Sequence, residues 1–222
     1  INNSYGKNLL GSFYQPNLVI SDTDLLKSLN SREIICGYAE ILKSSLLDSF
    51  KKFKYLDTNL NNIINLKKPF IENAILNSCN LKKKVVEIDE DEKNIRKILN
   101  LGHTFAHAFE SCLGFSSKLN HGEAVIIGIT IALEFSYQRR LIKNKTYNFI
   151  KKHLERIPLK KKFTSIFSKK DVSKIISFME SDKKNTTKKI NIILIKDFGK
   201  IKTNYQFDQN TLKQFLISEL KK

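Results

Sequence analysis

The sequence is short of glycine and cysteine, and each shortage excludes a class of protein. With 8 glycines in 222 residues, nothing matches the strand, glycine-rich turn and helix of a dinucleotide-binding fold. The three cysteines, Cys36, Cys79 and Cys112, are far apart and odd in number. They therefore fit neither a disulfide framework nor a metal-binding cysteine motif, and we interpret them as reduced thiols in a cytoplasmic protein.

Long apolar runs, targeting segments and repeats are missing as well. No run reaches the roughly 18 apolar residues of a transmembrane helix. No signal peptide is visible. The chain begins at Ile1 rather than at an initiator Met, and a missing N-terminal segment would remove the evidence for such a signal. No internal repeat or low-complexity linker interrupts the chain. We therefore expect no membrane partner.

Acidic residues are outnumbered by basic ones. There are 39 Lys and Arg against 22 Asp and Glu, which gives a formal net charge of +17. Strong basicity can indicate nucleic-acid binding, but the lysines are scattered among many Asn and Ile, and no recognition motif accompanies them. We expect no nucleic-acid partner, whereas a local excess of positive charge would suit a phosphate-bearing substrate.

The hydrophobic pattern predicts a mainly helical chain with a core of its own. Hydrophobic residues make up 41% of the sequence, which is enough for a core. A short buried strand is expected at 17–22, and a β-branched strand at 190–195 is expected to pair back with 201–205 through the turn at Gly199. The periodicity predicts helices near residues 31–50, 70–88, 94–113, 121–140, 145–155, 171–179 and 211–220.

The segment 96–110 carries a polar stripe among apolar residues. Arg96, Asn100, His103 and His107 are spaced i, i+4, i+7 and i+11, which would place them on one face of a continuous helix. The apolar flanks predict that this helix is buried. Because unpaired burial of such groups costs on the order of 2 kcal/mol or more each, we expect a metal ion or an anionic ligand to face the stripe.

Two further segments supply groups that would complete such a site. Glu40 and Lys43 are spaced i, i+3 in an apolar helix, although a simple ion pair on a solvated face is the commoner use of this spacing. Asn120 is an N-cap candidate, and His121 then lies in the first turn of an apolar helix. A carboxylate and two or more imidazoles from separate helices form a three-ligand set for Zn²⁺ or a similar ion, with one position left open.

With these segments the chain resembles the C-terminal part of the 3-dehydroquinate synthase family. Six blocks agree in order and spacing, and they lie at 6–16, 32–43, 82–92, 96–110, 121–125 and 179–184. The resemblance implies a helical metal- and substrate-binding domain with a small β-hairpin at 25–222. Residues 1–24 would be a linker and the last strand of an N-terminal nucleotide-binding α/β domain that is otherwise absent. We therefore expect the chain to be a C-terminal fragment.

The family's site implies a role for each matching residue. Glu40, His103 and His121 would hold a divalent metal, Zn or Co, and NAD would be bound mainly by the missing N-terminal domain. The catalytic contacts to the substrate would come from Lys43, Lys82, Arg96, Asn100 and His107. Further substrate contacts would come from Lys7, Asn8 and one of Lys183 or Lys184, the last at the phosphate end.

The resemblance also decides between two interpretations of the histidines. His103 and His107 at i, i+4 look like a zincin ligand pair, but that motif has a Glu directly after the first His, and Thr104 stands there. The resemblance makes His103 a ligand and His107 a substrate contact. Tyr38 stands where the family commonly has a small or apolar residue, a departure that removes no catalytic group.

The family's activity is a phosphate-eliminating carbon–oxygen lyase reaction of the shikimate pathway, in aromatic amino acid biosynthesis. It forms 3-dehydroquinate from a seven-carbon phosphorylated keto acid, in a cytoplasmic enzyme expected to be a homodimer when full length. The fragment alone is expected to be inactive. Alternatives are another sugar phosphate cyclase, an inactive remnant, or a polyol dehydrogenase of the iron-dependent alcohol dehydrogenase class. The last would usually have Asp in place of Glu40.

Overall fold

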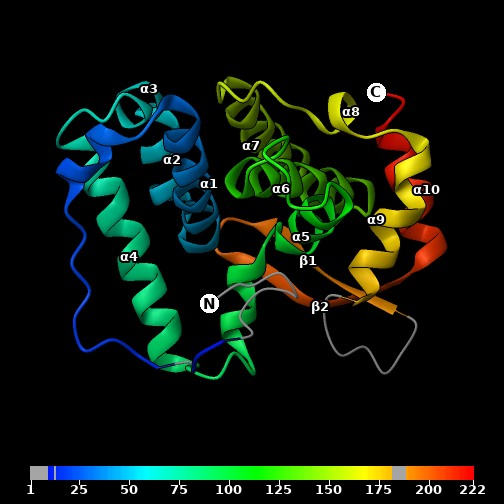
Figure 1. Ribbon diagram of the computed structural model, residues 1–222, viewed down its shortest axis with the longest axis horizontal. Helices are drawn as coiled ribbons and strands as arrows, with labels where there is room; N and C mark the ends of the chain where they lie inside the picture. Colours follow the sequence, from blue (N-terminus) through cyan, green and yellow to red (C-terminus); the bar gives the residue numbers. More distant parts are fainter. Residues whose placement is uncertain (1–9, 13, 182–188) are drawn as a thin grey trace.

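Helices make up most of the described part of the chain, as predicted, and an antiparallel hairpin accompanies them there (Figure 1). The computed structural model describes residues 10–12, 14–181 and 189–222. The helices in chain order are η1 (Thr23–Ser28), α1 (Ser31–Asp48), α2 (Phe50–Thr58), α3 (Leu60–Ile64), α4 (Phe70–Ile88), η2 (Ile95–Asn100), α5 (His103–Cys112), α6 (His121–Gln138), α7 (Asn144–Arg156), α8 (Phe163–Ile166), α9 (Lys169–Ser181) and α10 (Gln209–Glu219), where η marks a 3₁₀ helix. The strands are β1 (Lys189–Asp197) and β2 (Lys200–Asp208).

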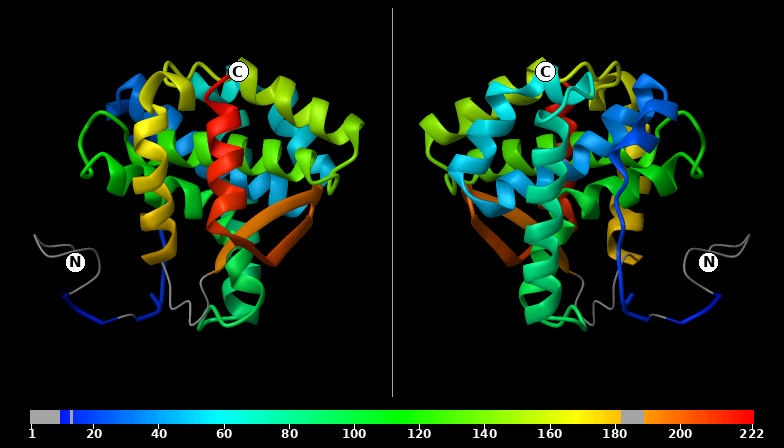
Figure 2. Two further views of the ribbon diagram at one scale, coloured as in Figure 1. Left: turned by 90° about the vertical axis from the view of Figure 1, so that its right-hand side faces the viewer. Right: turned by 90° about the vertical axis from the view of Figure 1, so that its left-hand side faces the viewer.

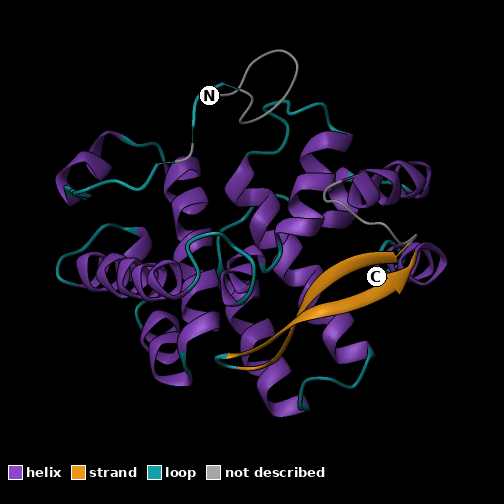
Figure 3. Cartoon of the chain, turned by 90° about the horizontal axis from the view of Figure 1, so that it is seen from below, coloured by secondary structure: helices purple, strands orange, loops and turns teal. Residues whose placement is uncertain are grey.

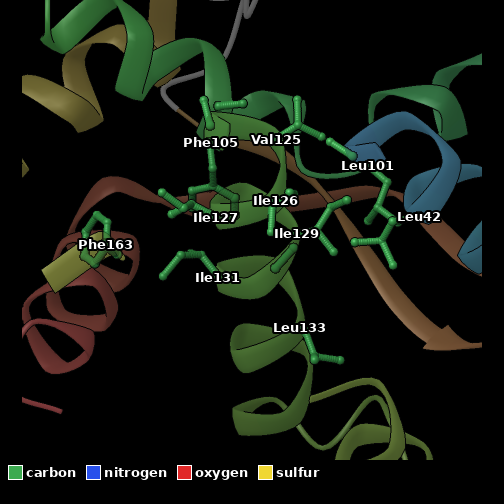
Figure 4. Packing of buried hydrophobic residues seen from close by; sticks show 14 of the residues in the cluster. Leu42, Leu101, Phe105, Val125, Ile126, Ile127, Ile129, Ile131, Leu133 and Phe163 are labelled. Atoms are coloured by element: carbon green, nitrogen blue, oxygen red, sulfur yellow. The ribbon is translucent and has the colours of Figure 1, made fainter. Parts of the chain in front are cut away.

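Helix α6 is the centre of the core. Its sequence is apolar on every side, as expected of a helix that is covered all round, and it packs against α1, α5, α7 and β1. Figure 4 shows Leu42 and Leu101 on one side of α6 and Phe163 on the other. Because α1 and α5 both pack on α6, side chains from the three helices can converge at one end of the core.

The helix starts follow from local capping. The Asn30 side chain accepts the N–H of Glu33 at 3.0 Å, and the Glu33 carboxylate accepts the N–H of Asn30 at 3.1 Å, which closes a capping box at the start of α1. At the start of α6 the Glu123 carboxylate accepts the N–H of Asn120 at 2.8 Å. The predicted N-cap at Asn120 is therefore confirmed.

The predicted hairpin is also confirmed. Strands β1 and β2 pair antiparallel from Lys189↔Asp208 to Asp197↔Lys200, and Figure 3 shows them as a two-stranded ribbon against the helices. The turn needs Gly199, because its φ is +68° and a Cβ there would lie 2.4 Å from the Asp48 carbonyl oxygen. Helices α9 and α10 run side by side next to the hairpin (Figure 2).

A buried polar network connects α1, α2 and α7. The Tyr38 hydroxyl lies 2.7 Å from His153 Nε2, and His153 Nδ1 lies 2.9 Å from a carboxylate oxygen of Asp57. Arg156 donates to the same Asp57 oxygen at 2.8 Å. His153 is 0% exposed, so the network is satisfied when a neutral imidazole donates through Nδ1 and accepts the Tyr38 hydroxyl hydrogen at Nε2.

The prediction of one continuous helix over 94–113 is wrong. The chain forms the 3₁₀ helix η2, turns at Leu101 and Gly102, and starts again as α5. Gly102 has φ +79°, and a Cβ there would lie 2.7 Å from Ile129 Cγ1 and 2.9 Å from the Ile129 backbone nitrogen. Close packing against α6 therefore requires a glycine at position 102 and an interruption of the helix there. Arg96 and Asn100 do not share a helix face with His103 and His107.

Two other predictions also need correction. Residues 17–22 form no strand, and Leu18, Val19 and Ile20 are 74%, 71% and 81% exposed, because no strand among the described residues pairs with them. The predicted helix 31–50 ends at Asp48, and Ser49 is extended and caps α2 by accepting the N–H of Lys52. Helices α3 and α8 are too short to give a periodic signal.

The helices predicted near 70–88, 121–140, 145–155, 171–179 and 211–220 are confirmed as α4, α6, α7, α9 and α10. Among the residues that the structure describes, no helix has both the length and the apolar content needed to cross a membrane.

Candidate metal and substrate site

The three predicted metal ligands converge from three helices. Glu40 lies on α1, and His103 and His121 are the first residues of α5 and α6. One ligand atom from each lies within 4.8 Å of the others. His103 Nε2 is 3.5 Å from a carboxylate oxygen of Glu40, and the rings of His103 and His121 are 5.4 Å apart between centroids. We call Glu40, His103 and His121 the triad.

The approach of α1 to α6 positions two members of the triad. A Cβ on Gly122, next to His121, would lie 2.3 Å from the Cα and carbonyl oxygen of Cys36 on α1. One turn away, Arg32 Nε and Nη2 donate to the Glu123 carboxylate at 2.8 and 2.6 Å. This bidentate ion pair and the glycine contact hold the two helices together beside the triad.

The histidine rings are oriented by oxygen acceptors at Nδ1. His103 Nδ1 lies 3.2 Å from the carbonyl oxygen of Leu101, and His121 Nδ1 lies 3.0 Å from a carboxylate oxygen of Glu110. An oxygen acceptor requires the hydrogen on Nδ1, so the neutral form of each imidazole keeps its lone pair on Nε2. This is the usual arrangement of metal-ligating histidines. A carboxylate and two imidazoles are a fitting donor set for Zn²⁺ or Co²⁺.

Glu110 was missed by the sequence analysis. It follows His103 by seven residues, so His103, His107 and Glu110 share one face of α5. Its side chain is only 7% exposed. A carboxylate that shares a helix face with two histidines is the signal that could have found it.

The Glu40–Lys43 pair is partly buried, unlike a simple pair on a solvated face. Lys43 Nζ is 2.6 Å from Glu40, and the Lys43 side chain is 7% exposed against 50% for Glu40. Burial alone would raise the pKa of Glu40, but the charge and the hydrogen bond of Lys43 outweigh it and lower that pKa. Burial, with the charge of Lys43, lowers the pKa of His103 to about 4, which leaves this imidazole neutral at neutral pH.

Lys82 is exposed on α4, and its charge influences Lys43. Burial lowers the pKa of Lys43 against the attraction of Glu40, and Lys82 lowers it further by repulsion. The structure therefore brings Lys82 within electrostatic range of Lys43. Lys43 lies next to Glu40 of the triad, and a second cation in its vicinity would favour an anionic ligand.

His107 lies beside the triad but is not part of it. Its ring is 5.5 Å from His103 and stacks on His121 at 6.1 Å between centroids. The group of potential ligands contains Glu40 and His121 in addition to His103, which favours the family pattern over a zincin-like pair. A role for His107 as a substrate contact stays a prediction.

Arg96 and Asn100 contact acidic residues of the segment between α4 and η2. Arg96 Nη1 donates to the carbonyl oxygen of Glu90, and Asn100 Nδ2 donates to the Glu92 carboxylate. Both residues are half-buried, and η2 packs against α1 and α4. The roles predicted for them are neither confirmed nor contradicted. The predicted contacts Lys7, Asn8, Lys183 and Lys184 lie outside the described residues.

Comparison with known proteins identifies the family. The model of the 3-dehydroquinate synthase C-terminal domain matches residues 37–185, and that of the N-terminal domain matches 1–36. The 3-dehydroquinate synthase of Pelagibacter ubique is 53% identical over all 222 residues of this chain, which cover 60% of that relative. That of a Thermoanaerobacter species is 37% identical over 96% of this chain and 58% of the relative. The chain thus spans about 60% of the length of these relatives.

Solved structures share the fold. A 2-deoxy-scyllo-inosose synthase complexed with carbaglucose-6-phosphate, NAD⁺ and Co²⁺ has a TM-score of 0.80 at 24% identity, with coverage of 98% of this chain and 60% of that one. A 2-epi-5-epi-valiolone synthase from Streptomyces hygroscopicus subsp. jinggangensis, with NAD⁺ and Zn²⁺ bound, has a TM-score of 0.80 at 19% identity, with coverage of 98% and 59%. At these identities the similarity establishes the architecture alone.

Proposed function

The chain belongs to the 3-dehydroquinate synthase family, and we propose that it provides the metal site and most of the substrate site of such an enzyme. The reaction would be the phosphate-eliminating formation of 3-dehydroquinate from a seven-carbon phosphorylated keto acid. The observation that carries this proposal is the convergence of Glu40, His103 and His121. The same proposal includes a homodimer and a cytoplasmic location. It also includes a boundary near residue 25 between a linker and the helical domain.

The triad would hold one divalent ion and leave a coordination position open for the substrate. When bound, the ion would polarise a substrate oxygen as a Lewis acid, and NAD would supply the hydride chemistry. This chain's part is to position the reacting groups. The acceptors at Nδ1 of both histidines keep each Nε2 available, and Lys43 places a buried positive charge next to Glu40.

The remaining polar residues would bind and orient the anionic substrate. Lys43 is paired with Glu40, and we propose that Lys82, whose charge lowers the pKa of Lys43, binds the same substrate. We also propose that Arg96 binds a carboxylate or phosphate by its planar guanidinium. Asn100 and His107 would hydrogen-bond substrate oxygens, which fixes the reacting geometry. Lys7, Asn8 and one of Lys183 or Lys184 are proposed as further contacts, with one of these two lysines at the phosphate end.

A pair of matched histidine variants tests the metal site. We expect the purified protein to contain one divalent ion per chain, His121→Ala to lose it, and His107→Ala to keep it, because only His121 is a member of the triad. Metal content is measured by atomic emission after dialysis. Loss of metal in His107→Ala with retention in His121→Ala would establish the zincin-like pair instead. Equal metal content in the wild type and His121→Ala would refute the triad.

The substrate class needs a second measurement. Another sugar phosphate cyclase would share the triad but act on a hexose or heptulose phosphate. Arg96 and Lys82 favour the keto acid, because they are cationic partners for its carboxylate. Phosphate release by the complete enzyme, compared between the keto acid and a heptulose phosphate, distinguishes the two: faster release from the heptulose phosphate would overturn the assignment.

A further inference from the structure

We propose that Glu110 is a positioning residue that fixes the ring orientation and the tautomer of His121, so that its Nε2 faces the other two triad residues. The inference rests on the metal site proposed above and assigns a role to a residue outside the triad. Its geometric basis is the 3.0 Å contact between a Glu110 carboxylate oxygen and His121 Nδ1. The carboxylate accepts at Nδ1, which leaves the Nε2 lone pair for an ion.

The burial of the two groups is unequal, and this makes Glu110 the fixed partner. The Glu110 side chain is 7% exposed, whereas that of His121 is 48% exposed. A half-exposed imidazole in the first turn of a helix can rotate about its side-chain torsions and exchange tautomers through water. A carboxylate held inside the core restricts both. Burial of a carboxylate is costly unless a partner compensates it, and the His121 ring is such a partner.

The arrangement joins two helices at the site. Helix α5 contributes the ligand His103 as its first residue. Two turns later it contributes Glu110, which supports the ligand His121 at the start of α6. His103 receives the equivalent support from the Leu101 carbonyl oxygen at 3.2 Å. Both imidazoles are thus held at Nδ1 by residues of the 101–110 segment. Such supporting groups typically change metal affinity by about 10- to 100-fold.

The first test reads the tautomer of His121 without any metal. The protein is labelled with ¹⁵N at histidine, stripped of metal and studied by NMR at a pH well above the ordinary imidazole pKa. His121→Ala assigns the signals. We expect the Nδ1–H form of His121 in the wild type, and a shift towards the Nε2–H form in Glu110→Gln and further in the near-isosteric Glu110→Met. A purely structural role of Glu110 would leave the tautomer unchanged.

The second test measures affinity for Co²⁺ by competition with a chromophoric chelator. We expect Glu110→Gln to bind one Co²⁺ about 10- to 100-fold more weakly than the wild type. Glu219→Gln is the matched control, because Glu219, the last residue of α10, is 8% exposed and pairs with Lys222 at 2.8 Å. This control should bind Co²⁺ like the wild type, and circular dichroism verifies the fold of each variant.

The outcomes separate the two proposals. Wild-type affinity in Glu110→Gln, or an Nε2–H tautomer in the wild type, would overturn the role of Glu110 even where the triad binds metal. If His121→Ala binds Co²⁺ as tightly as the wild type, the metal site itself is wrong, and the inference falls with it. Weaker binding together with the tautomer change supports the inference.

Discussion

Replacement of Gly122 by alanine should damage the metal site without touching any ligand. Gly122 follows His121 at the start of α6 and packs against the backbone of Cys36 on α1. A new Cβ would lie 2.3 Å from the Cys36 Cα and carbonyl oxygen. Backbone atoms cannot rotate away as the end of a side chain can. The start of α6 and the middle of α1 must therefore separate.

The size of the separation follows from the contact. Ordinary contact begins at 3.4 Å, so the Cβ and the Cys36 backbone must move apart by about 1.1 Å. This shift would fall between His121 and Glu40, which lie on the two helices that separate. Ligand geometry must hold within about 0.5 Å for full function. We therefore expect a loss of metal affinity of at least tenfold, together with a loss of about 1–3 kcal/mol in unfolding free energy from overpacking.

Gly37→Ala provides the matched control. Gly37 lies on α1, next to Cys36, and a Cβ there would meet nothing within 4 Å. Because alanine is the better helix former by about 1 kcal/mol, this variant should be as stable as the wild type or more stable, with unchanged metal affinity. Urea unfolding and Co²⁺ competition are measured on both variants. Equal stability and equal affinity of Gly122→Ala and Gly37→Ala would refute the argument that this contact sets the ligand geometry.

Two further predictions concern the buried network of α1, α2 and α7. Tyr38→Phe removes the hydroxyl 2.7 Å from His153 Nε2 and leaves a buried acceptor unpaired, so urea unfolding should show a loss of about 1–3 kcal/mol; an unchanged midpoint would contradict the network. Burial lowers the pKa of His153 below its ordinary value of 6.5, although the hydrogen bond and the charge of Asp57 act to raise it. As the pH falls, His153 takes up its proton in the unfolded chain before it does so in the folded protein. The free energy of unfolding is therefore highest above the ordinary imidazole pKa and decreases as the pH falls below it. His153→Gln should have a flatter profile of unfolding free energy against pH there, and an unchanged slope would refute this.

The sequence pointed to the three residues that converge in the structure, because part of their signal is local. Asn120 before an apolar run marks a helix start, which places His121 in the first turn. Glu40 and Lys43 share a helix face whatever the tertiary structure is. The resemblance to a known family then selected Glu40, His103 and His121 from the larger set of polar residues. The structure agrees with this selection in bringing the three together.

What the sequence could not show depends on tertiary contacts. The break at Gly102 arises because α6 approaches its backbone, and a 3.6-residue periodicity carries no information about such an approach. Glu110 supports His121 only because α5 packs on α6. The apolar residues Leu18, Val19 and Ile20 predicted a buried strand, but burial of a strand also requires a neighbour, and the described residues provide none.

The break at Gly102 suits a small substrate better than the continuous helix that the spacing predicted. In such a helix Arg96 and His107 would be separated by about 16 Å along the axis, at 1.5 Å per residue. At that separation a ligand at the triad would meet Arg96 only through the full length of the Arg96 side chain. Because the chain turns at Gly102, η2 instead packs against α1, the helix that carries Glu40. Polar residues of η2 and α5 can then approach one ligand from different directions, which a single helix face cannot achieve.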